Sequence, residues 1–130
     1  MYKRQRFAAL SAIWEHSSLQ LANLCQANGI EYFHFLQPNQ YVEGSKPLGA
    51  EERKVAIDPV SPYAESIVAG YPLLLAAGNR LASAGVHFAD LTQLFAGVDA
   101  PVCQDPCGYL NVEGAPRLAQ GRPDALAGRA

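Results

Sequence analysis

The chain has 130 residues, of which 49% are hydrophobic and 17% charged, and its formal net charge is −2. This length predicts one domain with a buried core, and this balance excludes an intrinsically disordered chain. The only basic cluster, Lys3, Arg4 and Arg6, is short and has no aromatic residues interleaved, so we expect no nucleic-acid partner.

The three cysteines, Cys25, Cys103 and Cys107, are an odd number and do not describe a disulfide framework. Cys103 and Cys107 could pair, but their spacing does not require it. Without a neighbouring histidine they make a poor zinc site, and we expect neither a metal nor another cofactor. No apolar run reaches the about 18 residues of a membrane helix. No apolar segment follows the basic start as it would in an export signal, so the compartment is left open.

The first predicted element is a helix, because apolar side chains recur at steps of three and four residues and form one broad apolar face. This stripe comprises Phe7, Leu10, Trp14, Ser17, Leu21, Leu24 and Asn28, joined by Ile13 and Cys25. Asn28-Gly29 predicts the end of the helix, because glycine accepts the left-handed conformation without steric cost. Ile30 to Leu36 then predicts a strand that is apolar on both faces, as is typical of a parallel sheet between helical layers.

The segment from Gln37 to Pro59 is long and polar, and predicts a lid or binding loop with a short helix around Glu51 to Ala56. A second long helix is predicted to begin at Ser61-Pro62, where the serine can cap and the proline suits the first turn. Pro72 lacks a backbone donor, so we expect a kink or a break near Gly70.

After Gly85, a second strand is predicted over Val86 to Leu91 and a short helix over about Val112 to Gln120. The alternation of helix and strand predicts parallel strands joined by right-handed crossovers. We expect a single α/β domain over residues 1–120 and a flexible tail over residues 121–130. A strand pair this small exposes backbone donors and acceptors, so a homo-oligomer or a complementing chain could pair at the sheet edge.

Three stretches carry a pattern that points to chemistry. The first is Tyr32-Phe-His-Phe-Leu-Gln-Pro-Asn-Gln-Tyr41, which continues into Gly44-Ser45-Lys46; the second is Val86-His-Phe-Ala-Asp-Leu-Thr92 with Phe95; the third is Asp105-Pro-Cys-Gly-Tyr-Leu-Asn111 with Gly114 and Leu118-Ala119. Their order and spacing resemble the C-terminal half of the SGNH/GDSL hydrolase family, and the resemblance runs from about residue 13 to residue 120.

The resemblance implies a partial three-layer α/β/α sandwich of the flavodoxin-like type and an esterase or lipase-like activity on acyl or acetyl esters. In that family, a serine from a Gly-Asp-Ser block is the nucleophile, and an Asp and a His near the end of the chain complete the triad. Of these groups, only Asp105 carries over to this sequence. With the family's strict spacing between Asp and His, Gly108 stands at the histidine position. With one residue more, which is the spacing that we favour, Tyr109 stands there.

Tyrosine is a poor substitute for the imidazole, because its unperturbed pKa is about 10 against about 6.5 for histidine. A tyrosine at neutral pH can donate a proton but hardly accept one from a serine. None of the serines lies in a Gly-Asp-Ser setting, and only Ser45, which follows Gly44, merits a test as nucleophile. We therefore expect a truncated or degenerate hydrolase-like protein that is inactive alone. The alternative is a non-catalytic ligand-binding or protein-interaction domain that reuses the scaffold.

Four polar side chains follow the carboxyl end of the first predicted strand, where open α/β sheets form their ligand crevices. They are Gln37, Asn39, Gln40 and Lys46. We expect them to bind a small acyl or carbohydrate ester, with ordinary hydrogen bonding within the loop as the alternative. Asp105 could equally be a turn residue before Pro106, and His34 is more typical of a hydrogen-bonded core histidine than of a catalytic one.

Overall fold

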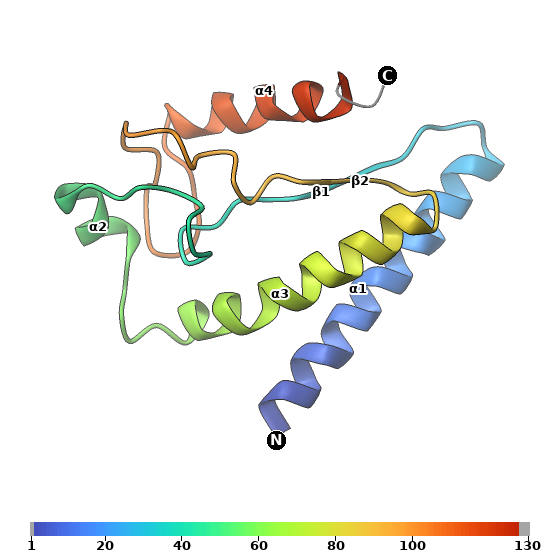
Figure 1. Cartoon of the computed structure of the whole chain (residues 1–130), viewed down its shortest axis with the longest axis horizontal. Coiled ribbons are helices and arrows are strands. Elements are labelled where there is room, and N and C mark those ends of the chain that lie inside the picture. The colour runs from blue at the N-terminus through green and yellow to red at the C-terminus, as the bar shows by residue number, and fades with distance from the viewer. Residues whose placement is uncertain (1, 128–130) are drawn as a thin grey trace. The chain divides into compact units, whose positions relative to one another are not determined.

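The computed structural model describes residues 2–127, with side chains over residues 4–121. In chain order the elements are α1 (Tyr2–Ala27), β1 (Phe33–Leu36), α2 (Ala50–Ala56), α3 (Pro62–Ser83), β2 (His87–Asp90) and α4 (Gly114–Ala127) (Figure 1). β1 and β2 pair in parallel, with Phe33 opposite His87 and Leu36 opposite Asp90. The predicted α/β chain with parallel strands is confirmed at this level. None of the described helices is both long enough and apolar enough to span a bilayer.

The chain divides into two compact units. Unit 1 comprises Met1–Leu36 and Ala69–Asp90, and unit 2 comprises Gln37–Val68 and Leu91–Ala130. Unit 1 therefore contains α1, both strands and the second part of α3, whereas unit 2 contains α2, α4 and the long connections. This division does not test the predicted single domain over residues 1–120. Residues 128–130 of the predicted tail lie outside the described part of the chain, and α4 continues to Ala127.

Local signals explain where the elements begin and end. Gly29 has a φ of 68°, and the N–H of Ile30 donates to the carbonyl of Cys25 over 2.9 Å, which closes α1 as predicted. α3 begins at Pro62, also as predicted. It continues through Pro72 without a break, so of the predicted kink or break near Gly70 only the break is excluded. Pro72 lies on the exposed side of the helix, so water can bind the carbonyl that lacks its helical donor.

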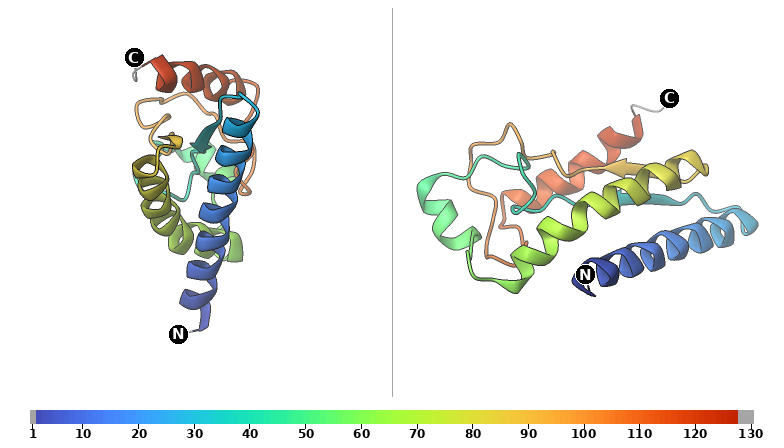
Figure 2. Two further views of the ribbon diagram at one scale, coloured as in Figure 1. Left: turned by 90° about the vertical axis from the view of Figure 1, so that its right-hand side faces the viewer. Right: turned by 60° about the horizontal axis from the view of Figure 1, so that its bottom comes forward.

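In unit 1, α1 and the second part of α3 pack side by side on one face of the strand pair (Figures 1 and 2). The buried core consists of Leu36, Leu81, Val86 and Phe88, and the partly buried side chains against it are Trp14, Leu19, Ala22, Tyr32, Tyr71, Leu74 and Leu75. A Cβ at Gly78 would lie only 2.1 Å from Cζ of Phe88, so this position of α3 has to be glycine. The residue is thus a packing glycine.

α1 packs with a different face from the predicted one. The apolar side chains left exposed are Leu10 (56%), Ile13 (62%), Leu21 (48%) and Leu24 (62%). The packed face instead contains Ser11 and Ser18, both buried, and the Ser11 hydroxyl donates to the carbonyl of Leu73 on α3 over 3.2 Å. The predicted stripe was therefore wrong for these four residues, whereas its Trp14 does pack against the core. The small residues on the adjacent face allow a closer approach of the neighbouring elements. α1 therefore has two apolar stripes, and only one is covered within unit 1.

Candidate functional site

The structure places every sequence-predicted site residue in unit 2, in or near the turn over residues 105–110. These residues are Gln37, Asn39, Gln40, Lys46, Asp105 and Tyr109. Some of the contacts join residues that are far apart in the chain. Nε2 of Gln40, for example, donates over 3.1 Å to the carbonyl of Asp105, which is 65 positions away. The roles of these residues differ from one residue to the next.

Asp105 organises the turn that carries Tyr109. Its Oδ1 atom accepts the backbone N–H groups of Cys107 (2.8 Å) and Tyr109 (3.3 Å). The N–H of Gln104 also donates to the carbonyl of Tyr109 over 2.9 Å, which closes the turn. The carboxylate therefore has the turn-forming contacts that the sequence offered as the alternative to a triad role. The Tyr109 side chain is 67% exposed.

Asn39 and Tyr63 form the wall behind this turn. The buried Asn39 donates from Nδ2 to the Tyr63 hydroxyl over 2.8 Å and accepts the N–H of Tyr41 at Oδ1 over 3.1 Å. A Cβ at Gly108 would lie 3.0 Å from the Tyr63 hydroxyl and 3.1 Å from Asn39 Nδ2. Burial raises the pKa of Tyr63 despite the hydrogen bond from Asn39, so the phenol stays protonated at neutral pH.

Gln40 and Ser45 are also engaged within unit 2. Gln40 donates from Nε2 to the carbonyls of Ala56 and Asp105, each over 3.1 Å, and so joins the end of α2 to the turn. Ser45 is 2% exposed and donates its hydroxyl to the carbonyl of Asn39 over 2.7 Å. A hydroxyl that is buried and already donating is not poised as a nucleophile.

Lys46 forms a buried ion pair with Glu52 of α2, with Nζ 3.1 Å from Oε2 and side chains only 2% and 1% exposed. Lys46 also donates to the carbonyl of Val98 over 2.7 Å, and Glu52 Oε1 accepts the N–H groups of Val102 (2.7 Å) and Cys103 (2.9 Å). Burial pushes the pKa of Glu52 up, but these N–H groups and the ammonium together hold it below its ordinary value. Burial, reinforced by Glu52, raises the pKa of the Cys103 thiol to about 11.

An open hollow of about 330 Å³ lies beside the turn. Its polar side chains are Gln37 and Tyr109, and its apolar wall comes from Leu110 and from one face of α4. The α4 residues of this wall are Ala115, Leu118 and Ala119. Asn39, Gln40 and Lys46 instead line a space of about 10 Å³, which holds about one water molecule. Of the predicted ligand-binding side chains, only Gln37 therefore faces a volume that a small organic group could fill.

Asn111 and Gly114 position the α4 wall, a role that the sequence analysis did not assign to them. Asn111 accepts the N–H groups of Glu113 (2.9 Å) and Gly114 (3.0 Å) at Oδ1, and its Nδ2 donates to the carbonyl of Pro101 over 2.9 Å. A Cβ at Gly114 would lie 2.8 Å from the carbonyl oxygen of Val102. An asparagine shortly before a predicted helix is a capping signal that could have found this arrangement.

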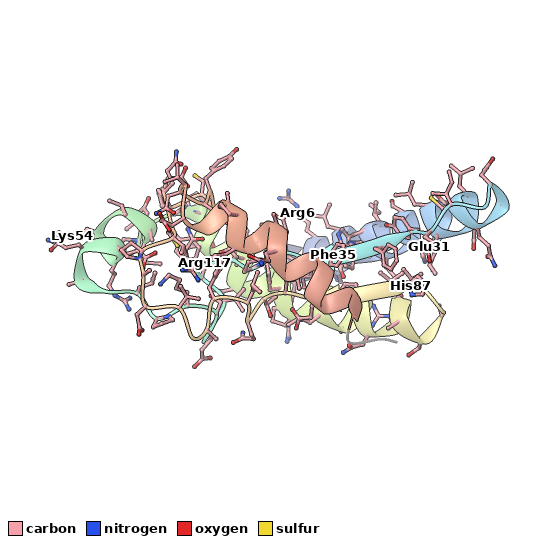
Figure 3. All side chains as sticks on the ribbon, turned by 90° about the horizontal axis from the view of Figure 1, so that it is seen from above. Arg6, Glu31, Phe35, Lys54, His87 and Arg117 are labelled. Carbon is pink, nitrogen blue, oxygen red and sulfur yellow. The ribbon has the colours of Figure 1, made fainter. Side chains whose placement is uncertain are left out.

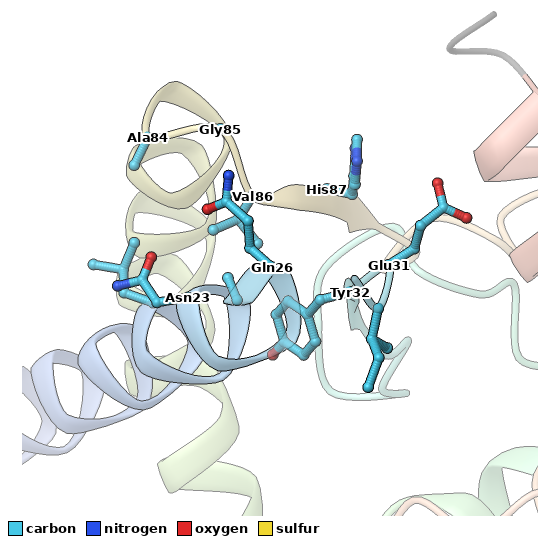
Figure 4. A pocket seen from close by; sticks show the side chains of 11 residues that line it. Asn23, Gln26, Glu31, Tyr32, Ala84, Gly85, Val86 and His87 are labelled. Carbon is cyan, nitrogen blue, oxygen red and sulfur yellow. The ribbon is translucent and has the colours of Figure 1, made fainter. Parts of the chain in front are cut away.

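Unit 1 contains a separate hollow of about 380 Å³ at the amino ends of its strands, whose polar side chains include Asn23, Gln26, Glu31 and His87 (Figure 4). None of the sequence-predicted site residues lines it. The hollow of unit 2 is lined by Gln37 and Tyr109, two of the sequence-predicted site residues, so we take it as the candidate site.

Unit 1 also brings a serine and a histidine together. Ser18 Oγ lies 2.6 Å from His34 Nδ1, the Tyr32 hydroxyl lies 3.2 Å from Ser18 Oγ, and the Trp14 ring is 4.4 Å from the His34 ring. Burial lowers the pKa of His34, which favours the neutral imidazole. Because Ser18 is only 2% exposed, a substrate carbonyl cannot reach it. The pair therefore agrees with the interpretation of His34 as a hydrogen-bonded core histidine.

All three cysteines are free thiols. Among the described residues, no group of three or more His, Cys, Asp or Glu side chains is arranged to hold a metal ion. Comparison of the chain with protein-family models, with curated proteins and with solved structures finds no match in any of the three. The resemblance to SGNH/GDSL hydrolases therefore stays a prediction.

Proposed function

We propose that this chain is an SGNH/GDSL hydrolase-like protein that binds a small acyl ester in the hollow of unit 2 without hydrolysing it. The observation that carries the proposal is that Gln37 and Tyr109 share one hollow with the apolar face of α4. These two residues come from the first and third stretches on which the family resemblance rests. The same proposal includes the family's three-layer sandwich, of which a parallel strand pair with helices on one face would be part.

The chemistry of the hollow suits an ester with a short acyl chain. Leu110 and Leu118 offer apolar surface to the chain, and burying each methylene contributes about 0.8 kcal/mol. The Tyr109 phenol carries an O–H group that can donate to the ester carbonyl. Gln37 offers an amide that can both donate and accept. A cavity of about 330 Å³ is at the lower end of the range for small-molecule sites, which favours a small ligand.

The same hollow lacks the groups for acyl transfer. Neither a serine nor a histidine is among the residues that line it. Asp105, the one residue that carries over from the family's triad, has Oδ1 engaged by two backbone N–H groups of its own turn. A nucleophile with an adjacent base is the minimum for covalent hydrolysis, so we propose binding without turnover.

Saturation-transfer NMR with ethyl butyrate tests the proposal. We expect transfer to the ester in the wild-type chain and its loss in Ala115→Trp, which fills the hollow from an exposed position of α4. The matched control is Ala84→Trp, which adds the same bulk to the hollow of unit 1 and should leave the signal unchanged. Equal signals from Ala115→Trp and the wild type would exclude the unit 2 hollow as the ester site.

A further inference from the structure

α1 carries an exposed apolar stripe with an internal symmetry. It contains Leu10, Ile13, Leu21 and Leu24, between 48% and 62% exposed, with the exposed Ser17 at its centre. The steps along the stripe are three, four, four and three residues, so it reads the same in both directions. At 3.6 residues per turn, these five positions fall within an arc of about 80°. A stripe of this kind is complementary to itself when two helices run antiparallel.

We propose that α1 packs against α1 of a second copy of this chain, about a two-fold axis at Ser17. In this register Leu10 faces Leu24 of the second copy, and Ile13 faces Leu21 of the second copy. A two-fold interface requires such self-complementarity, because each contact occurs twice. Ser17 donates its hydroxyl to the carbonyl of Ile13 on its own helix over 2.8 Å. It thus presents a small, satisfied side chain where the two helices come closest.

The charges on α1 favour the antiparallel arrangement. Arg4 and Arg6 lie near the amino end of the helix, where positive charge opposes the helix dipole, and α1 has neither an acidic residue in its first turn nor a basic one in its last. Antiparallel packing places Arg6, which lies within the arc of the stripe, beside the last turn of the other helix, where the partial charge is negative. The exposed Glu31 follows that turn and offers a carboxylate to Arg6.

The size of the surface predicts a weak dimer. A helix of 26 residues is about 39 Å long and about 10 Å wide, so one face covers about 400 Å². Stable complexes bury about 800 Å² on each partner. We therefore expect an association in the micromolar range or weaker, detected as a sedimentation coefficient that increases with protein concentration.

Two variants test the surface by sedimentation velocity. Leu24→Glu places a charge in the stripe at a position that is 62% exposed, so the fold tolerates it, and dimerisation should weaken at least tenfold. Val60→Glu, at an 86% exposed position of unit 2, is the matched control and should sediment as the wild type does. A chain that stays monomeric at high concentration would overturn the proposal. A dimer that survives Leu24→Glu would also overturn it, because that dimer would form at another surface, for example at the sheet edge.

Cross-linking tests the register. The test uses a chain in which all three native cysteines are replaced by serine, with its helical content checked by circular dichroism. In this background, Ser17→Cys should readily form a disulfide-linked dimer on oxidation. His16→Cys is the control, because residue 16 lies about 100° round the helix from residue 17. Equal cross-linking of the two variants would exclude a two-fold axis at Ser17.

Discussion

Lys46 and Glu52 are paired out of contact with water, with Lys46 Nζ 3.1 Å from Glu52 Oε2 and neither side chain more than 2% exposed. The pair connects the loop after residue 37 to α2, and through Glu52 Oε1 it also positions the backbone at residues 102–103. The sequence suggested Lys46 as a ligand-binding residue. Its contacts instead hold together the framework on which the candidate site is built.

Lys46→Met should therefore strongly destabilise unit 2. The variant leaves the Glu52 carboxylate buried without its counter-charge, a loss of about 3–5 kcal/mol for buried pairs. Lys54→Met is the matched control, since Lys54 projects from α2 into solvent and pairs with Glu51 at 67% and 85% exposure (Figure 3). An exposed pair contributes less than about 1 kcal/mol. Urea denaturation followed by circular dichroism compares the two, and equal midpoints would contradict the structural role of Lys46.

Glu52 should also make unit 2 acid-sensitive. The pKa of Glu52 in the folded chain lies below its ordinary value of 4.5, so the unfolded chain binds the proton more readily as the pH falls. The stabilisation is complete above pH 4.5 and is lost as the pH falls through the folded pKa. Glu52→Gln should be less stable than the wild type at pH 7 but should lose less stability on acidification below pH 4.5. Parallel stability curves for the two proteins below pH 4.5 would contradict this.

His34 should give unit 1 its own acid transition at a higher pH. Burial holds the pKa of His34 below its ordinary value of 6.5, so the folded chain favours the neutral ring that Ser18 contacts. This contribution is complete above pH 6.5 and is lost as the pH falls below it. Thermal unfolding between pH 7.5 and 5.5 should show a melting temperature that falls with pH in the wild type, and less steeply in His34→Asn. A slope that His34→Asn leaves unchanged would contradict this assignment.

Gly108 should not tolerate a side chain. Its φ of 94° lies in the left-handed region, which costs other residues about 1–2 kcal/mol, and a Cβ there would press on the Tyr63 hydroxyl at 3.0 Å. Gly108→Ala should therefore lower the urea midpoint. Gly97→Ala is the control, because a Cβ at Gly97 would meet no atom within 4 Å. If the two alanine variants were equally stable, Asn39 and Tyr63 would not constrain the turn as described.

Much of the secondary structure follows from local signals in the sequence. Gly29 and Pro62 mark helix ends through backbone geometry alone. A strand that is apolar on both faces, in a chain that alternates helix and strand, predicts parallel strands correctly. The packed face of α1 could not be predicted in this way. Both stripes of α1 are apolar enough to be buried. The buried stripe is the one that contains Ser11 and Ser18, whose small side chains let α3 and the sheet come close to the helix.

The contacts of the candidate site residues could not be predicted from the sequence. Asn39, Gln40 and Lys46 were candidate ligand contacts because polar residues follow a strand end. Each is instead engaged by partners far along the chain, such as Val98, which is 52 positions from Lys46. Such partners cannot be identified from local sequence. Of the four predicted ligand-binding residues, only Gln37 lines the open hollow, and its role as a ligand contact stays a prediction.

Tyr109→His restores the residue that the family resemblance places after Asp105, and it should still give no hydrolysis. An imidazole at position 109 would have no serine among the residues lining the hollow from which to accept a proton. The measurement is the release of p-nitrophenolate from p-nitrophenyl butyrate, compared with Tyr109→Phe. Turnover that appears only in the histidine variant would reveal a nucleophile near the turn.

The rate of p-nitrophenyl butyrate hydrolysis by the wild-type chain and by Asp105→Asn tests the central claim most directly. Asparagine keeps the side-chain oxygen that accepts the N–H groups of Cys107 and Tyr109, so the turn is preserved while the carboxylate charge is removed. We expect both proteins to match the rate of the buffer alone. A wild-type rate well above the buffer rate that disappears in Asp105→Asn would show a working carboxylate and contradict binding without turnover.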